Sequence, residues 1–287
     1  MNNQEILNSI FRSLPTLLNF HNHDSEVYKL INDVNNVCIL ALFGESGPQH
    51  ACIGEAGEIE LPFVSMGSIN STHLFGLDEL IIFTFYARNR RNYKRVADIG
   101  ANIGLHSTVL AKLGFEVQCY EPDSYHLELL KRNLSLNDIT SKVTIHDKAV
   151  STENGSLEFI RVLGNTTGSH LAGAKKNPYG ELEKFTVPTV AFRDILRRVD
   201  LVKLDVEGHE LEIILSTGSA DWSCTDAMVE IGTSHNAKGV FGHLNAIDVK
   251  MYSQKNSWRR VTRFDQMPQS HHEGSLFISR REEMNWA

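Results

Sequence analysis

The sequence predicts an α/β protein with a doubly wound, mostly parallel sheet and a small β-rich appendage at its N-terminus. From residue 95 onward, apolar strand-like runs alternate with helical patterns, which is typical of a parallel sheet covered by helices. The first 74 residues lack this alternation and contain short strand-like runs between glycines and prolines. The length of 287 residues suits an appendage over 1–74 and a main domain over 75–287.

In the appendage, the pattern predicts a helix over 4–20 that is interrupted at Pro15, followed by short strands at 37–43, 50–54 and 58–64. We expect this appendage to form a dimer contact or to cover the site of an acceptor substrate, so a homodimer is one expected state. The main domain then opens with an apolar-faced helix over 76–89. Its acids lie early and its arginines lie late, as the helix dipole favours.

The alternating part of the chain supplies the parallel sheet. Strands are predicted at 95–100, 115–122, 142–150, 199–208 and 226–232, and helices at 105–113, 124–137, 192–198, 209–218 and 237–254. Further strands are expected at 156–162 and 184–190, with a terminal strand pair at 258–264 and 274–280.

A Gly- and Asn-rich loop over 164–181 separates two of these strands. Loops of this length are often lids or binding loops, and this one could close over the acceptor substrate with His170, Lys175 and Lys176 inside. A plain surface loop is the other interpretation.

Charge and composition exclude several classes of protein. The net charge of −7 argues against a general affinity for nucleic acid or anionic membranes. The longest apolar run, near 80–87, is too short to span a bilayer, and an early Glu5 without a basic segment argues against a signal peptide. We expect a cytoplasmic protein with free thiols rather than disulfides or a zinc site, since no C-x-x-C pair occurs among Cys38, Cys52, Cys119 and Cys224.

The glycine turn after the first strand of the main domain is the candidate cofactor site, because open α/β sheets bind ligands at the carboxyl ends of their strands. A dinucleotide loop reads G-x-G-x-x-G and approaches a pyrophosphate. Here "DIGANIG" places Asp98 before Gly100, Asn102 in the middle position and Gly104 one residue early. This spacing favours a cofactor that has no phosphate.

S-adenosylmethionine fits such a turn, because Asp98 and backbone carbonyls can accept hydrogen bonds from its ammonium group. Glu121 ends the next strand, directly before Pro122, where its carboxylate can accept from both ribose hydroxyls. Asp147 ends the third strand, where it could meet the adenine. The structural alternative is that Asp98 and Glu121 cap helices.

The stretch "VKLDVEGHE" is the second unusual feature. On a strand, Lys203, Asp205 and Glu207 would share one face. Charges in a central parallel strand are costly unless they are paired or functional. They form either a catalytic group or a structural Lys203–Asp205 ion pair with Glu207 at a helix N-terminus, and both could hold together.

The stretches "VADIGANIGLHS", "YEPD", "VKLDVEGHE" and "VEIG" together resemble the FkbM-type family of S-adenosylmethionine-dependent methyltransferases, over roughly 75–280. The resemblance implies a class I methyltransferase fold, which is Rossmann-like with seven strands, and methylation of a hydroxyl group on a sugar, polyketide or similar metabolite. It places Asp205 and Glu207 at the reacting end and the cofactor on Asp98, Gly100, Asn102, Gly104 and Glu121.

A weaker resemblance points to metal-dependent sugar O-methyltransferases, which hold Mg²⁺ through acids at the ends of the fourth and fifth strands. Asp205 and Glu230 match those places, but Ile231 stands where a second acid often follows. The resemblance therefore leaves Mg²⁺ open, with Asp205 and Glu230 as the candidate ligands.

The leading hypothesis is O-methylation of a small molecule or glycan. Asp205 is the first candidate for the base or for the group that orients the acceptor, followed by His235 and then His209. The alternatives are an N-methyltransferase, an NAD-dependent oxidoreductase and a non-catalytic protein that binds an adenosyl compound.

Overall fold

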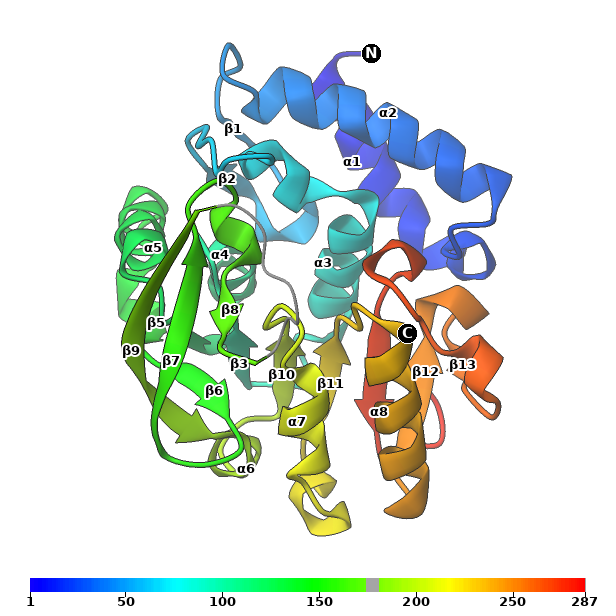
Figure 1. Cartoon of the computed structure of the whole chain (residues 1–287). Coiled ribbons are helices and arrows are strands. Elements are labelled where there is room, and N and C mark those ends of the chain that lie inside the picture. Colours follow the sequence, from blue (N-terminus) through cyan, green and yellow to red (C-terminus); the bar gives the residue numbers. More distant parts are fainter. Residues whose placement is uncertain (174–180, 287) are drawn as a thin grey trace.

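The computed structural model describes residues 1–173 and 181–286 and has a central sheet with helices on both faces (Figure 1). Its strands are β3 (Arg95–Ile99), β4 (Glu116–Tyr120), β5 (Val143–His146), β10 (Leu201–Leu204), β11 (Asp226–Val229), β12 (Lys250–Ser253), β13 (Arg259–Arg260) and β14 (Leu276–Ser279). Within the described residues, this sheet has eight strands in the order β13-β12-β14-β11-β10-β3-β4-β5.

The sheet confirms the predicted α/β class, because its five strands from β11 to β5 in that order run parallel. Only β14, which is antiparallel to β11 and β12, and the edge strand β13 depart from this direction. The strand that the sequence analysis did not predict is β12, which lies inside the helix expected over 237–254.

Two apolar clusters cover the two faces of the sheet. Alternate residues of one strand enter opposite clusters, so Val96 of β3 faces one cluster and Ala97 the other. The first cluster contains residues of α3 (Leu77–Asn89), α4 (Leu105–Lys112) and α5 (Ser124–Leu136). The second contains residues of α6 (Phe192–Leu196), α7 (Glu210–Leu215) and α8 (Ser234–Ala246).

The N-terminal segment is mainly helical, which corrects the expected β-rich appendage. It contains α1 (Asn3–Ser13), α2 (Glu26–Phe43) and a short antiparallel pair, β1 (His50–Cys52) and β2 (Glu58–Glu60). The predicted strand over 37–43 is wrong, because these residues continue α2 and bury side chains at helical spacing. In Figure 1, α2 lies along the outer edge of the molecule, and the apolar residues of α1 join the cluster of α3 and α4.

A second, smaller sheet is inserted after the third strand of the central sheet. It has the order β6-β9-β7-β8 and consists of β6 (Ala149–Ser151), β7 (Gly155–Val162), β8 (His170–Leu171) and β9 (Leu182–Ala191). The strand predicted over 142–150 is therefore two strands that belong to different sheets. The expected loop over 164–181 contains the short 3₁₀ helix η6 (Thr166–Gly168) and β8, while Lys175 and Lys176 lie outside the described residues.

The C-terminal elements also differ from the expectation. The helix predicted over 237–254 ends at Ala246, and Asp248 turns the chain with a φ of +53° before β12 begins. The expected terminal strands β13 and β14 do not pair with each other, because β12 lies between them. No helix among the described residues has the length and apolar character needed to cross a membrane. Each of the four cysteines, all of them described, is a free thiol.

His21 joins the N-terminal segment to the C-terminal part of the chain. The indole nitrogen of Trp258 donates a hydrogen bond to His21 Nδ1 over 2.9 Å, and His21 Nε2 lies 3.1 Å from the Leu14 carbonyl oxygen. Since an indole N–H can only donate, Nδ1 is the acceptor and the proton sits on Nε2. The ring is therefore neutral, and its burial lowers the pKa of His21 to about 4.

This histidine predicts a loss of stability in mild acid. In the unfolded state the His21 ring is protonated below about pH 6.5, whereas in the folded state it stays neutral down to about pH 4. The free energy of unfolding should therefore fall as the pH drops from 6.5 to 4. We expect the stability of the wild type relative to His21→Asn to fall by about 3 kcal/mol over this range. Urea denaturation of both proteins at several pH values measures it, and a pH-independent difference would contradict the assignment.

Candidate functional site

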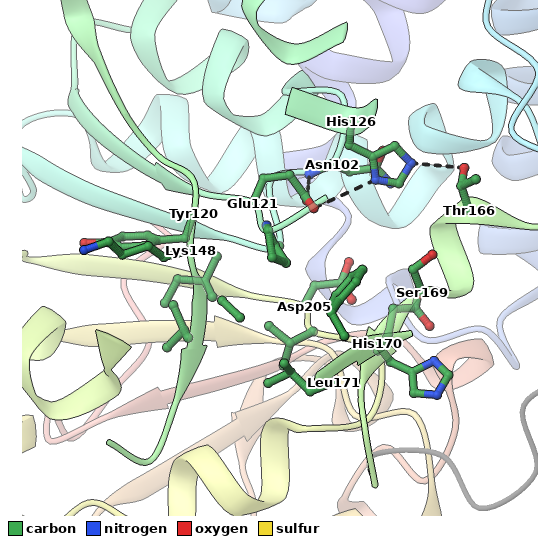
Figure 2. A pocket seen from close by; sticks show the side chains of 18 residues that line it. Asn102, Tyr120, Glu121, His126, Lys148, Thr166, Ser169, His170, Leu171 and Asp205 are labelled. Atoms are coloured by element: carbon green, nitrogen blue, oxygen red, sulfur yellow. Dashed lines mark hydrogen bonds and ion pairs between the residues drawn. The ribbon is translucent and has the colours of Figure 1, made fainter. Parts of the chain in front are cut away.

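A cavity lies at the carboxyl ends of β3, β4 and β10 and is lined on its other sides by residues of the inserted sheet and its connections (Figure 2). The central sheet and its turns contribute Gly100, Asn102, Glu121, Pro122, Asp205 and Glu207 to its lining. The inserted sheet and its connections contribute Lys148, Phe159, Thr166, Ser169, His170 and Leu171. The cavity thus brings together six of the predicted site residues, and the second group was not expected apart from His170.

The glycine turn after β3 packs directly against the turn after β10. Gly100 has a φ of +76°, and a Cβ atom added to it would lie 1.7 Å from the Asp205 carbonyl oxygen. Asn102 also has a left-handed backbone, with a φ of +51°, and its side chain accepts a hydrogen bond from the Ile103 amide over 2.8 Å. Only glycine at position 100 allows the two turns to approach this closely.

Glu121 is the buried acid of the cavity. One carboxylate oxygen accepts from the Asn102 amide over 2.8 Å, and the other accepts from the Asp123 amide over 2.9 Å. Burial nevertheless raises the pKa of Glu121 to about 7. Figure 2 shows that His126 lies between this carboxylate and Thr166, with His126 Nε2 at 3.0 Å from the Thr166 hydroxyl oxygen.

Arg161 of β7 links the inserted sheet to the start of α5. Its guanidinium donates to both oxygens of Asp123, over 2.9 and 2.6 Å. Asp123 also caps α5 and is fully buried. Burial alone would raise the pKa of Asp123, but the hydrogen bonds from Arg161 outweigh it and hold this pKa below its usual value.

Three predicted cofactor residues do not line the cavity. Asp98 is fully buried under the glycine turn, where one oxygen accepts from the Ser107 hydroxyl over 2.7 Å. Its other oxygen has no hydrogen-bond donor among the described residues. Gly104 packs against Leu130 of α5. Asp147 is exposed, because β5 ends at His146 and the chain crosses there to the inserted sheet.

The charged residues of "VKLDVEGHE" do not share one strand face, because β10 ends at Leu204. Lys203 alone lies on the strand, and its ammonium is 3.3 Å from an Asp205 carboxylate oxygen and 3.4 Å from the Gly100 carbonyl oxygen. Burial alone would lower the pKa of Lys203, but Asp205 and Asp98 outweigh it and raise that pKa. The ion pair is present, and it also holds Asp205 beside the cavity.

Glu210 supports the turn that carries Asp205 and Glu207. One of its oxygens accepts from the amides of Val206, over 3.0 Å, and Gly208, over 3.1 Å. Burial raises the pKa of Glu210 to about 7. Our sequence reasoning missed this role, although an acid at the start of a helix, just after a glycine, is a recognisable signal for such a contact.

The other candidates for catalysis or metal binding lie outside the cavity lining. His235 is exposed on the first turn of α8, and His209 Nε2 lies 3.1 Å from the Ser151 hydroxyl oxygen. Burial and the Asp205 carboxylate raise the pKa of Glu230 well above its ordinary value. In the described part of the chain, no three His, Cys, Asp or Glu side chains form a group that could hold a metal ion, so Mg²⁺ gains no support.

Comparison with known proteins identifies a family. A family model described as the methyltransferase FkbM domain matches residues 98–264, which is more than half of the chain. The methyltransferase sdnD of Sordaria araneosa is 29% identical, over 44% of this chain and 61% of its own length. This chain therefore spans less than two thirds of that relative.

Solved structures with a similar architecture are more distant. Methyltransferase FkbM from Methylobacillus flagellatus KT is 17% identical with a TM-score of 0.41, and the match covers 64% of this chain and 43% of that one. An S-adenosylmethionine-dependent O-methyltransferase from Thermotoga maritima is 16% identical with a TM-score of 0.39, and the match covers 69% and 63%.

The role of Glu210 can be measured as stability. Glu210→Ala removes the acceptor of two amides at a buried turn and should lower the free energy of unfolding by about 2–3 kcal/mol. Glu210→Gln keeps an acceptor oxygen and should lose less. Glu212→Ala, which removes a half-exposed acid of the same helix, is the matched control and should stay within about 0.5 kcal/mol of wild type. Equal losses in the two alanine variants would contradict this role.

Proposed function

Because this chain belongs to the FkbM methyltransferase family, we propose that it transfers a methyl group from S-adenosylmethionine to a hydroxyl group of a small molecule or glycan. The observation that carries the proposal is the buried Glu121 carboxylate beside the glycine turn, facing a cavity at the ends of two adjacent parallel strands. Cofactors of open α/β sheets bind at this edge of the sheet.

The residues present fit the cofactor. Each Glu121 oxygen receives one backbone amide, which leaves lone pairs that can accept the ribose hydroxyls. Phe159 and Leu171 give the cavity apolar walls suited to a nucleobase. Glu207 lies at the same cavity, and its carboxylate suits the positive charge of the methionine part. When bound, S-adenosylmethionine supplies a methyl group that its sulfonium cation has already activated.

The chain's own contribution is to position the acceptor and to remove its proton. Asp205 is the candidate base, because it lines the cavity and keeps a carboxylate oxygen 3.3 Å from the Lys203 ammonium. Lys203 also donates to the Gly100 carbonyl, so the same ammonium links the base to the cofactor turn. The group that removes the acceptor's proton and the turn that holds the cofactor would then lie next to each other, so that positioning and general base catalysis act together.

Binding of the demethylated product, S-adenosylhomocysteine, tests the cofactor assignment. We expect micromolar binding by calorimetry and no binding of NAD. The affinity should be about tenfold weaker at pH 6 than at pH 8, because Glu121 accepts from both ribose hydroxyls only in its ionised form and its pKa is about 7. Glu121→Gln should weaken binding about 10- to 100-fold at pH 8 and remove the pH dependence. Binding of NAD instead would refute the assignment.

The role of Asp205 can be separated from cofactor binding. Acceptors are first found with labelled S-adenosylmethionine and a panel of sugars, other alcohols and amines. Methyl transfer to amines alone would show that the reaction is N-methylation and not the proposed O-methylation. Asp205→Asn should then reduce turnover at least about 100-fold and change the affinity for S-adenosylhomocysteine only a few-fold. Asp147→Asn, at an exposed site outside the cavity, is the matched control. Unchanged turnover in Asp205→Asn would exclude Asp205 as the base.

A further inference from the structure

The cofactor cavity is covered by a segment that has few strand contacts of its own. We call residues 163–171 the roof segment; it contains η6 and β8 and contributes Thr166, Ser169, His170 and Leu171 to the cavity lining. β8 pairs with β7 through only two residue pairs, Phe159 with Leu171 and Ile160 with His170. Beside β8, the Ser169 hydroxyl accepts from the Val162 amide over 3.2 Å, and the Asn165 amide donates to the Val162 carbonyl over 3.0 Å. The inserted sheet thus holds one side of η6, and contacts outside this sheet hold the other.

A loop of the N-terminal segment provides those contacts. The Thr166 amide donates to the Met66 carbonyl over 3.1 Å, and the Ser68 amide donates to the Gly164 carbonyl over 3.2 Å. Between these bonds, Gly67 forms a bridge with Asn165. The loop over 64–70 and the roof segment are thus joined through their backbones, although about a hundred residues separate them.

Gly67 makes this close approach possible. It has a φ of +97°, and a Cβ atom added to it would lie 1.9 Å from the Gly164 carbonyl oxygen. A side chain at position 67 would therefore force the loop and the roof segment apart. Gly67 itself does not line the cofactor cavity.

The loop is held firmly enough to act as an anchor. The Ser71 amide donates to the Val64 carbonyl over 2.9 Å, and the Ser71 hydroxyl accepts from the Val64 amide over 3.0 Å. Met66 is buried and belongs to the apolar cluster that includes α3 and α4. On the other side, Thr166 reaches His126, which lies next to Glu121 (Figure 2).

We infer that the loop over 64–70 is a positioning element of the cofactor cavity, which holds the roof segment in place and so sets the affinity for the adenosyl cofactor. This inference rests on the proposed function. It gives the N-terminal segment an indirect part in binding, through the backbone contacts of Met66, Gly67 and Ser68, which do not themselves line the cavity.

The test compares two glycines of similar positive φ. Gly67→Ala adds a Cβ atom against Gly164, whereas Gly114→Ala adds one at a φ of +99° with nothing within 4 Å. We expect Gly67→Ala to weaken the binding of S-adenosylhomocysteine at least about tenfold. Gly114→Ala should bind within about twofold of wild type, although both variants lose thermal stability through the left-handed backbone. Equal affinities in the two variants would overturn the inference.

Hydrogen exchange on the wild type provides an independent measurement, which also decides the matter if Gly67→Ala does not fold. Addition of S-adenosylhomocysteine should slow exchange at the amides of Ser68 and Thr166, while the Gly114 amide stays unchanged. Binding without protection of Ser68 and Thr166 would overturn the inference and leave the proposed function intact. Absence of any binding of S-adenosylhomocysteine to the wild type would refute the proposed function, and the role of the loop would fall with it.

Discussion

The backbone contact between the turns after β3 and β10 is the constraint on which the site depends. Gly100 approaches the Asp205 carbonyl so closely that no Cβ atom fits between them. The Lys203 ammonium then bridges the Gly100 carbonyl and the Asp205 carboxylate. The glycine turn and a candidate catalytic acid are therefore held in one unit, and a shift of either turn would move the other.

Buried carboxyl groups act here as acceptors for backbone amides. Glu121 accepts from Asn102 and Asp123, and Glu210 accepts from Val206 and Gly208. Burial raises both pKa values to about 7, since water no longer stabilises the charge. Each acid shapes a turn at the carboxyl edge of the sheet, and Glu121 also keeps acceptor capacity for a ligand in the cavity. The hydrogen bonds from these amides, which would otherwise lack partners, offset part of the free energy of burying the carboxyl groups.

Three parts of the chain build the cavity together. The central sheet provides the turns, the inserted sheet provides the roof segment, and the N-terminal loop over 64–70 holds that roof through backbone hydrogen bonds. Arg161 adds a further link, because it pairs with the N-terminal cap of α5 from the inserted sheet. The family match covers residues 98–264 and so does not include this N-terminal loop. The homodimer and the cytoplasmic location remain predictions from the sequence.

The sequence by itself determined the α/β class, the glycine turn, the position of Glu121 and the resemblance to the family, because strand, turn and helix follow one another within a short stretch there. Only the tertiary structure decided that 37–43 is helical, since a short apolar run fits a buried helix as well as a strand. It also placed Asp98 beneath the turn and left Asp147 exposed. The contact of Gly67 with Gly164 and the arrangement of the roof segment depend on segments far apart in the chain, which no local pattern of residues encodes.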